Sequence, residues 1–337
     1  MKMPHRRLGS PGPATSALGL GCMGMSDFYG PADRHESIAT IHAALEAGIT
    51  LFDTGDFYGM GHNELLIHEA LATQSRDSVL ISVKFGALRD PASAWLGYDC
   101  RPAAVKNFLT YSLRRLGVDY IDIYRPARLD PAVPIEETVG TIADLIKAGY
   151  VRYVGLSEVG AGTLRRARAV HPICDLQIEY SLVSRGIETE ILPACRELGI
   201  GITAYGVLSR GLISGHWSKE RSTGSRTMFP RFQGENLDNN LRLVEKLRAI
   251  ASNIGCSVAQ VAIAWVAAQG DDIVPLIGAR RRDRLDEALG ALAQRLSAEQ
   301  LRSLTDAVPP DAVAGGRYAS AQLAHLDSEK GDAQNPR

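Results

Sequence analysis

The sequence lacks the features that mark several common classes of protein. Its 337 residues carry 37 basic and 38 acidic side chains, so the formal net charge is −1. A balance this even gives no whole-chain argument for binding nucleic acid or an anionic membrane. No run approaches the roughly 18 apolar residues of a membrane-spanning helix, and no apolar leader opens the chain. These absences predict a cytoplasmic protein without a nucleic-acid or membrane partner.

Cysteine is scarce and follows no pattern. The five cysteines form no Cys-x-x-Cys pair and no His/Cys spacing typical of zinc, which favours buried thiols in a reducing compartment. His42, His62 and His68 have no partners at ligand spacing, so we predict no metal site. No G-x-G-x-x-G motif follows a strand, and a Rossmann cofactor site is therefore unsupported.

An alternation of apolar strand, polar loop and amphipathic helix fills most of the chain. Eight such units without an internal linker predict one α/β domain, a (β/α)8 barrel over residues 1–327, followed by a disordered tail at 328–337. Residues 4–17 have a hairpin pattern, and residues 238–252 predict an extra helix between strands seven and eight. The predicted strands are 18–22, 49–53, 79–83, 119–124, 151–155, 174–178, 200–204 and 273–276.

Three ionisable side chains follow two of these strands. Asp53 ends the run Ile49–Phe52, Tyr58 lies five residues further on, and Lys84 ends the next strand. Active sites of parallel α/β folds lie at these strand ends. A catalytic phenol, with a pKa near 10, needs a cation to favour its phenolate, which Lys84 would supply if Asp53 holds it. The alternative is a loop tyrosine beside a structural ion pair.

Short motifs around and beyond these residues follow one another over nearly the whole chain. They are Gly21-Cys22-Met23-Gly24-Met25, Phe52-Asp53-Thr54, Tyr58-Gly59, Val83-Lys84, Glu136-Glu137-Thr138-Val139-Gly140, Gly155-Leu156-Ser157-Glu158, Gln177-Ile178-Glu179-Tyr180-Ser181-Leu182 and Pro230-Arg231-Phe232. In content and order they resemble the motifs of the aldo-keto reductases. The resemblance implies a TIM barrel with the hairpin as a lid on its bottom, a nicotinamide-dependent oxidoreductase, and a bacterial branch related to the potassium-channel β-subunits. It also implies Tyr58 as the proton donor with Lys84 and Asp53.

The chain departs from the family pattern at Ala127, where relatives carry a histidine that donates a hydrogen bond to the substrate carbonyl. Losing one such donor costs on the order of 10²–10³ in rate in comparable sites. Arg125, two residues earlier on an extended strand, shares a face with Ala127 and could bind the substrate there. The alternatives are that Arg125 is a solvated rim charge, or that His62 is a weak substitute donor.

The resemblance also implies a nicotinamide site. Ser157 and Gln177 match the residues that bind the carboxamide, and Tyr205 matches the aromatic residue that stacks on the ring. Four arginines between positions 280 and 284 suit the 2′-phosphate of NADPH, with Arg280 and Arg284 at the family positions, unless this basic run is only a solvated face. The remaining predicted cofactor contacts are Met23, Leu208, Ser209, Gly211, Arg226, Gly278 and Glu287.

Aromatic residues near the predicted mouth, Phe28, Phe85 and Trp95, suggest an apolar pocket for a small carbonyl or alcohol substrate. Two functions stay open. One is an NADPH-dependent carbonyl reductase or alcohol dehydrogenase. The other is a nicotinamide-binding sensor, which Ala127 keeps open. A homo-oligomer is also compatible with the sequence.

Overall fold

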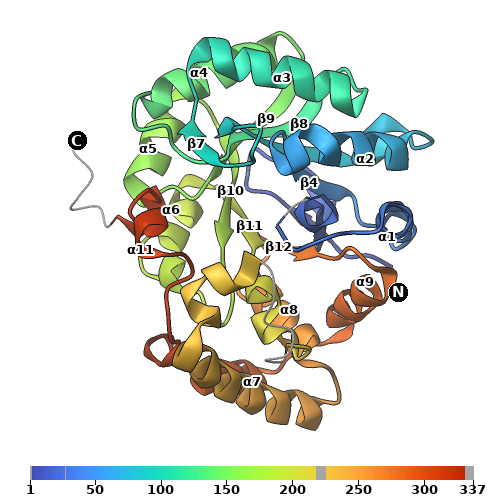
Figure 1. The fold of residues 1–337 in the computed structure, drawn as a ribbon, viewed down its shortest axis with the longest axis vertical. Helices are drawn as coiled ribbons and strands as arrows, with labels where there is room; N and C mark the ends of the chain where they lie inside the picture. Colours follow the sequence, from blue (N-terminus) through green and yellow to red (C-terminus); the bar gives the residue numbers. More distant parts are fainter. Residues whose placement is uncertain (1, 27, 218–224, 331–337) are drawn as a thin grey trace.

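Eight parallel strands close into a barrel in the computed structural model, which describes residues 2–26, 28–217 and 225–330 (Figure 1). The barrel is closed by pairing between the first strand and the last, and this confirms the predicted (β/α)8 fold. In spatial order the strands are β3 (Gly19–Gly21), β4 (Leu51–Gly55), β5 (Leu80–Phe85), β8 (Ile121–Pro126), β9 (Val151–Ser157), β10 (Ile173–Glu179), β11 (Gly201–Tyr205) and β12 (Ile273–Gly278).

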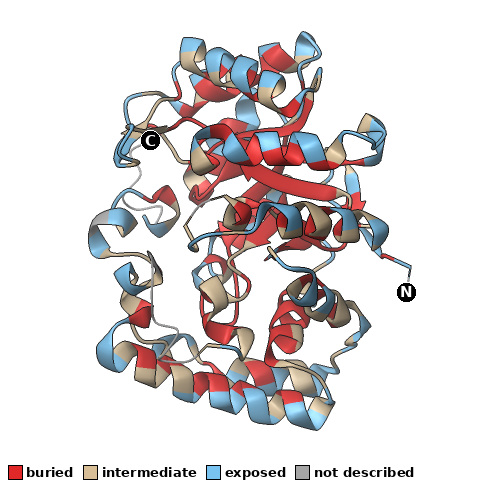
Figure 2. Ribbon diagram, turned by 45° about the vertical axis from the view of Figure 1, so that its right-hand side comes forward, coloured by how far each residue is buried: buried red, intermediate tan, exposed pale blue. Residues whose placement is uncertain are grey.

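The strands are buried on both faces (Figure 2), because helices cover the outside and side chains fill the inside. Each predicted strand overlaps an observed one. The covering helices are α1 (Arg34–Glu46), α2 (His62–Leu71), α3 (Pro102–Leu116), α4 (Ile135–Lys147), α5 (Ala161–Val170), α6 (Ile191–Leu198), α8 (Val258–Ala267) and α9 (Arg282–Leu289).

Local sequence explains the ends of these helices. Helix α3 begins with Pro102, whose missing N–H has no partner to lose in the first turn, and ends at Gly117, whose φ of 64° favours glycine. Helix α8 has a capping box in which the side chains of Ser257 and Gln260 each bind the other's backbone N–H.

The predicted hairpin lid forms from the antiparallel strands β1 (His5–Arg7) and β2 (Ala14–Ser16). Leu8, directly after β1, is fully buried against residues of four barrel strands, Leu51, Ile123, Cys174 and Val274. The hairpin therefore closes the end of the barrel opposite the carboxyl ends of the strands.

Segments outside the repeating units surround the open end. The extra helix between strands seven and eight is α7 (Gly234–Ile254), which lies apart from the ring of helices in Figure 1. A second hairpin, β6 (Ala87–Arg89) with β7 (Trp95–Tyr98), follows β5 and was not predicted. The remaining helices are α10 (Ala298–Ala307) and α11 (Ser320–Leu323), and short 3-10 turns include η2 (Tyr58–Gly61), η5 (Ser209–Ser214), η8 (Pro230–Phe232) and η11 (Asp327–Glu329).

The predicted disordered tail begins too early at residue 328. Ser328 and Glu329 belong to η11, and both bind Arg317. Of the predicted tail, residues 331–337 lie outside the described part of the chain.

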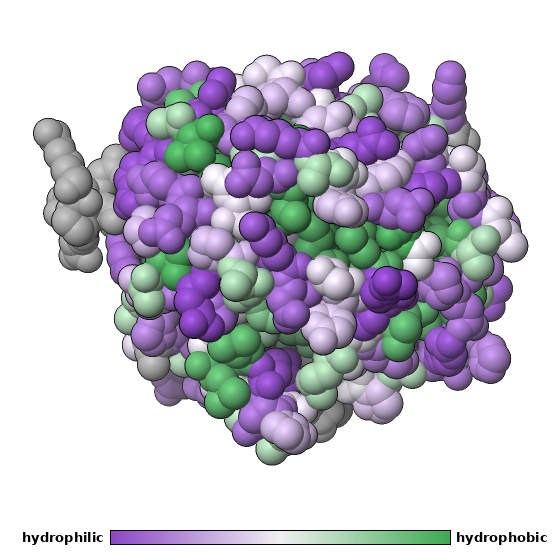
Figure 3. Space-filling model, turned by 90° about the horizontal axis from the view of Figure 1, so that it is seen from above, coloured by the Kyte–Doolittle hydropathy of each residue, from purple (hydrophilic) through white to green (hydrophobic). Residues whose placement is uncertain are grey.

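The surface over α3 and α4 is mainly hydrophilic, with smaller apolar areas between the charged side chains (Figure 3). In the part of the chain that the structure describes, no single helix is long and apolar enough to span a membrane. Helices α7 and α8 are long and apolar enough only when they are taken together, and this pair is bent by 87° at the break between them.

Candidate active site

The structure brings Asp53, Lys84 and Tyr58 together at the carboxyl ends of β4 and β5. The Lys84 Nζ forms an ion pair with Asp53 Oδ1, and both side chains are buried, with exposures of 6% and 3%. The same Nζ lies 5.1 Å from the centroid of the Tyr58 ring. Tyr58 itself is 6% exposed, so it is not a loop residue on the surface.

The second carboxylate oxygen of Asp53 is also held. It accepts hydrogen bonds from Ser82 Oγ at 2.8 Å and from Gln177 Nε2 at 2.7 Å. These contacts come from β5, which pairs with β4, and from β10, which lies across the barrel interior from β4. Asp53 therefore has little freedom to move away from Lys84.

Burial dominates the electrostatics of this group. It raises the pKa of Tyr58 well above its ordinary value, the negative charge of Asp53 raises it further, and the positive charge of Arg128 opposes both. Burial lowers the pKa of Lys84, although the ion pair with Asp53 opposes that change. The phenol is therefore held in its protonated form, as a proton donor requires. The positive charge that most lowers the pKa of Tyr58 belongs to Arg128, whereas the sequence predicted Lys84 for that part.

Both interpretations of Arg125 are wrong. Its side chain is fully buried inside the barrel, where Nη2 lies 3.0 Å from Asp175 Oδ2 and 3.0 Å from Ser82 Oγ. Strand alternation failed as a guide because β8 ends at Pro126, so Ala127 no longer continues the face of Arg125. Arg125 is held by a carboxylate on β10 and reaches neither the mouth nor solvent.

Ala127 lies in a buried cluster beside Tyr58. It is 3% exposed and belongs to a small buried cluster with Phe57, Tyr58 and Ala87. Its backbone N–H donates to the carbonyl of Phe85 at 2.8 Å, which joins the end of β8 to the end of β5. A methyl group donates no hydrogen bond, so the polar partner of Tyr58 must come from elsewhere.

Arg128 is a charged residue beside this group that the sequence reasoning did not consider. Its Nη1 donates to the carbonyl of Ala127 at 2.6 Å and lies 3.4 Å from Ser157 Oγ. Its charge acts on Tyr58, Tyr98 and Lys84. The one signal in the sequence was its position four residues after the end of the predicted strand 119–124.

His62, the other substitute donor considered, is exposed on α2. Its Nδ1 is bonded to Ser26 Oγ at 2.9 Å, away from the buried cluster around Ala127. Within the described residues, no group of three or more His, Cys, Asp and Glu side chains could hold a metal ion.

The predicted carboxamide and ring contacts lie on three adjacent strands. Ser157 pairs with Gln177 across β9 and β10, and Tyr205 ends β11 beside Glu179. The Tyr205 hydroxyl donates to Glu158 Oε1 at 2.7 Å and lies 3.1 Å from the Tyr318 hydroxyl. These strand ends therefore form one continuous floor next to Asp53 and Tyr58.

The loop after β11 passes through the left-handed region of backbone conformation. Ser209, Arg210 and Gly211 have consecutive positive φ values of 46°, 56° and 96°. The N–H groups of Ser209 and Gly211 donate to the carbonyls of Gly206 and Leu208 in the same loop. An added Cβ at Gly211 or at Gly278, which ends β12, would meet no heavy atom within 4 Å, so both backbones border open space where a ligand could approach closely.

Three other predicted contacts border this loop and the site. Leu208 is partly buried against the main apolar core of the barrel. Met23 is partly buried against the small cluster that contains Tyr58 and Ala127. Arg226 donates from Nε to the carbonyl of Arg210 at 2.8 Å and stacks on the ring of Tyr29, 4.7 Å from its centroid. Arg226 thus joins the loop after β11 to the loop that follows β3.

The arginine run at the start of α9 borders a cavity of about 730 Å³ and is engaged with the rest of the protein. Arg280 donates to the carbonyls of Tyr29 at 2.9 Å and Gly30 at 3.2 Å. Arg284 pairs with Glu287 at 3.1 Å. Glu287 also binds His216, which follows η5, at 2.8 Å. The run is therefore more than a solvated face.

Two of the three predicted substrate aromatics lie beside Tyr58. The ring of Phe28 lies 6.5 Å from that of Tyr58, and Trp95 stacks on Phe28 at 6.1 Å. Phe57, 4.8 Å from Tyr58 and 5.7 Å from Trp95, completes this aromatic wall.

The prediction for Phe85 is wrong. Its fully buried ring stacks on Tyr124 at 4.2 Å and faces Phe108 of α3 at 6.4 Å. Because Lys84 points into the barrel, the next residue on β5 points outward to the helices.

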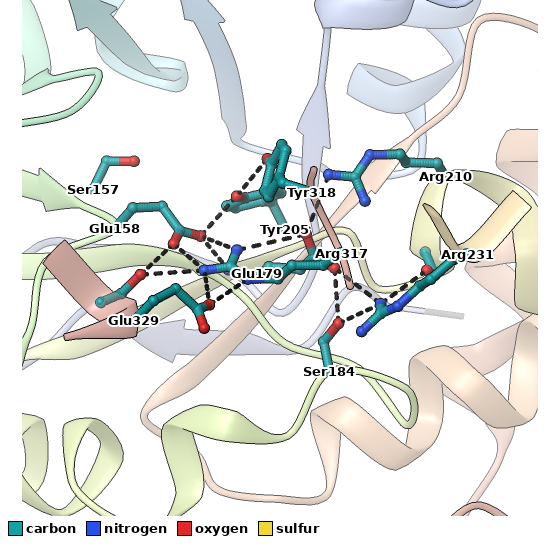
Figure 4. Close-up of polar contacts among 12 residues, drawn as sticks. Ser157, Glu158, Glu179, Ser184, Tyr205, Arg210, Arg231, Arg317, Tyr318 and Glu329 are labelled. Atoms are coloured by element: carbon teal, nitrogen blue, oxygen red, sulfur yellow. Dashed lines mark hydrogen bonds and ion pairs between the residues drawn. The ribbon is translucent and has the colours of Figure 1, made fainter. Parts of the chain in front are cut away.

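A C-terminal segment reaches back over the mouth (Figure 4). Arg317 binds both oxygens of Glu158, at 2.9 and 2.5 Å, and also pairs with Glu329 at 2.7 Å. Beside it, the guanidinium of Arg210 lies 4.6 Å from the ring centroid of Tyr318. Burial by itself raises the pKa of Glu158, but the charge and hydrogen bonds of Arg317 outweigh burial and bring that pKa to about 2.

Comparison with known proteins places this geometry in a family. The Aldo/keto reductase family model matches residues 17–309. A protein from Glycine max named "Probable aldo-keto reductase 1" is 44% identical over 315 residues, which cover 93% of this chain and 91% of that protein. Among solved structures, a glycerol dehydrogenase from Gluconobacter oxydans superposes with a TM-score of 0.83 at 28% identity, covering 92% of this chain and 97% of the other.

A second solved structure agrees. The holo form of an aldo-keto reductase from Bacillus halodurans has a TM-score of 0.77 at 25% identity, covering 91% of this chain and 97% of the other. The matches span nearly the full length of both partners, including the strand ends that carry Asp53, Tyr58 and Lys84. The chain therefore belongs to the aldo-keto reductase family, and it is a carbonyl/alcohol oxidoreductase with a small-molecule substrate.

Proposed function

We propose that this protein interconverts a carbonyl compound and an alcohol with NADPH as the cofactor and Tyr58 as the proton donor. The observation that carries the proposal is the buried group of Asp53, Lys84 and Tyr58 at the carboxyl ends of β4 and β5, below the aromatic wall.

Each residue of the group has a distinct part. Tyr58, kept protonated by burial, donates its hydroxyl proton to the substrate oxygen. Lys84 places a positive charge next to the phenolate that remains, and Asp53 keeps Lys84 in position. When bound, NADPH supplies the hydride for the carbonyl carbon. In alcohol oxidation the same phenol acts in reverse, as the base.

The nicotinamide end of the cofactor would lie over Tyr205, with Ser157 and Gln177 as carboxamide partners. Support comes from the adjacency of these residues at the ends of β9, β10 and β11. The amide of Gln177 already binds Asp53, so one side chain would join the cofactor to the catalytic group.

The phosphates would lie on the open side of the loop at Gly211, and the 2′-phosphate would be held by Arg280 and Arg284. Arginine pairing with a phosphate is charge-assisted and bidentate, and NADH offers no group of this kind. The existing contacts of Arg280 with the carbonyls of residues 29–31 would place the loop after β3 next to the adenosine end.

For the substrate we propose a small or ring-containing carbonyl compound that packs against Phe28, Phe57 and Trp95. The relative from Gluconobacter oxydans is named a glycerol dehydrogenase, which supports alcohol oxidation as one direction of the reaction. The exposed edge of Trp95, at 46% exposure, would tolerate substrates of different length.

Steady-state turnover of NADPH with a panel of aldehydes and ketones tests the proposal. Tyr58→Phe should lower kcat by several orders of magnitude while NADPH affinity stays nearly unchanged, because the hydroxyl acts in the transition state. Tyr111→Phe, on an exposed ring of α3, is the matched control and should behave as wild type. Near wild-type turnover in Tyr58→Phe would refute the assignment.

A nicotinamide-binding sensor is the second candidate, and Ala127 is the observation that favours it. A wild-type protein that binds NADPH tightly but turns over no carbonyl or alcohol of the panel would support the sensor. Retention of the proton donor Tyr58 favours the enzyme, since a sensor needs only the cofactor site.

A further inference from the structure

We propose that Arg128 is a catalytic residue whose guanidinium donates a hydrogen bond to the substrate carbonyl oxygen, opposite the Tyr58 hydroxyl, and supplies the donor that Ala127 lacks. This inference rests on the proposed function and adds a residue to it. It assigns to Arg128 direct contact with the oxygen on which negative charge develops.

The position of Arg128 is the first argument. It lies two residues beyond the end of β8, and Nη1 spans from the carbonyl of its neighbour Ala127, at 2.6 Å, to Ser157 Oγ, at 3.4 Å. Ser157 marks the proposed nicotinamide end of the cofactor, and Ala127 packs in the same cluster as Tyr58. The guanidinium thus lies next to Ser157 and next to a residue of the cluster that contains Tyr58.

The charges around Arg128 agree with this position. Its positive charge is the main influence that opposes the raised pKa of both Tyr58 and Tyr98. Burial by itself would lower the pKa of Arg128, but Tyr205, Tyr318 and the nearby carboxylate of Glu158 raise it, so the guanidinium stays charged. The phenols of Tyr58, Tyr98, Tyr205 and Tyr318 therefore all lie near this one cation.

The free donors of Arg128 are the third argument. None of the ion pairs among the described residues includes Arg128, whereas its buried counterparts Arg125, Arg210 and Arg317 each pair with a carboxylate. A guanidinium has five N–H groups, and within residues 2–26, 28–217 and 225–330 only those on Nη1 of Arg128 have hydrogen-bond partners. A half-buried cation with unused donors beside a proton donor is suited to a ligand oxygen.

The chemistry balances with these groups. In reduction, the C–H bond forms with the hydride of NADPH, the carbonyl π bond breaks, and its electron pair moves to oxygen. That oxygen takes the proton of Tyr58, while Arg128 stabilises its charge before the O–H bond is complete. The products are an alcohol, oxidised cofactor and a phenolate that regains its proton from water.

The test compares Arg128→Met, Arg128→Gln and Arg128→Ala with wild type. We expect kcat for carbonyl reduction to fall about 10²- to 10³-fold in each variant, as for loss of one oxyanion donor, with NADPH affinity by fluorescence titration within about threefold of wild type. Guanidinium chloride at millimolar concentration should restore part of the activity of Arg128→Ala. Arg101→Met, at an exposed arginine on the outer surface, is the control and should change neither quantity.

A pH profile separates a catalytic role from a structural one. Because Arg128 opposes the raised pKa of Tyr58, its removal should move the rise of alcohol oxidation, where the phenolate is the base, to higher pH. A structural defect would lower the rate at every pH alike and would not respond to guanidinium.

The outcomes are distinguishable from those of the proposed function. Full kcat in a folded Arg128→Met or Arg128→Gln, with Tyr58→Phe inactive, overturns this inference and leaves the proposed function intact. An effect confined to KM for acidic substrates also overturns it, because Arg128 would then anchor a carboxylate. If circular dichroism shows that Arg128→Met does not fold, two other measurements test the inference: the rescue of Arg128→Ala by guanidinium and the kcat of Arg128→Gln. Wild-type activity in Tyr58→Phe refutes the proposed function whatever Arg128 does.

Discussion

Replacing Arg317 by methionine tests whether one buried ion pair holds the C-terminal segment over the mouth of the barrel. Arg317 lies in the segment after α10, and its guanidinium binds both oxygens of Glu158. Methionine keeps much of the apolar stem but removes the charge and every hydrogen bond. Glu158, whose side chain is fully buried, then loses its main partner.

The structure sets the size of the effect. The pKa of Glu158 falls from 4.5 to about 2, mainly because Arg317 outweighs the cost of burial. At about 1.36 kcal/mol for each pH unit, the ionised carboxylate contributes roughly 3 kcal/mol to stability. Breaking one partner out of a buried pair costs about 3–5 kcal/mol in other proteins, which agrees. We expect Arg317→Met to lower the free energy of unfolding by about 3 kcal/mol at pH 7.

The sign of the pH dependence follows from the lowered pKa. A carboxyl group whose pKa is lower in the folded state stabilises the fold fully above its unfolded pKa of about 4.5. That contribution is lost as the pH falls from there toward 2. Wild type should therefore lose stability over this range, and Arg317→Met should lose less because the contribution is already absent.

Urea unfolding at several pH values measures the difference, and limited proteolysis reports whether residues 315–330 open first. The matched control is Arg101→Met, which removes an ion pair with Asp99 in which the arginine side chain is 72% exposed. Solvent screens such a pair, so little change is expected. The reasoning is refuted if Arg317→Met unfolds within 1 kcal/mol of wild type at pH 7.

Further predictions concern the cofactor and the pocket. The double variant Arg280→Ala with Arg284→Ala should weaken NADPH binding at least tenfold more than NADH binding, and equal affinities of wild type for both cofactors would contradict the preference. Ala127→His should raise carbonyl turnover less than tenfold, because the position is packed against Tyr58 and Arg128 would already supply the hydrogen-bond donor. A larger gain in kcat would show that no other side chain supplies that donor. Trp95→Ala should raise KM for ring-containing ketones about tenfold with kcat little changed, and an unchanged KM would remove Trp95 from the pocket.

The barrel and its catalytic group were predictable because both depend on local pattern. Short apolar runs alternating with helical periodicity specify strands and helices, and eight such units have few ways to bury all their apolar faces. Once the strands are parallel, residues at their carboxyl ends meet at one edge. This is why Asp53 and Lys84, 31 positions apart, form an ion pair as expected.

The orientation of single side chains near the strand ends was less predictable. Arg125 and Phe85 were both assigned to the pocket, but one points into the barrel and the other toward α3. Within a strand, alternation predicts which side chains point to the same face of the sheet. The residue at which the strand ends depends instead on how the surrounding strands and helices pack. β8 stops at Pro126, so Arg128 lies in the loop that follows this strand.

The sequence by itself determined the order of strands and helices, the N-terminal hairpin and the placement of Asp53, Tyr58 and Lys84 near the ends of two strands, because these follow from local sequence pattern and from the geometry of a closed parallel barrel. Only the tertiary structure decided which arginine lies beside Tyr58 and what covers the mouth. Arg317 and Glu158 are 159 positions apart, and no local pattern links them. Their pairing depends on the path by which the chain returns to the mouth after α10, and long-range packing alone determines that path.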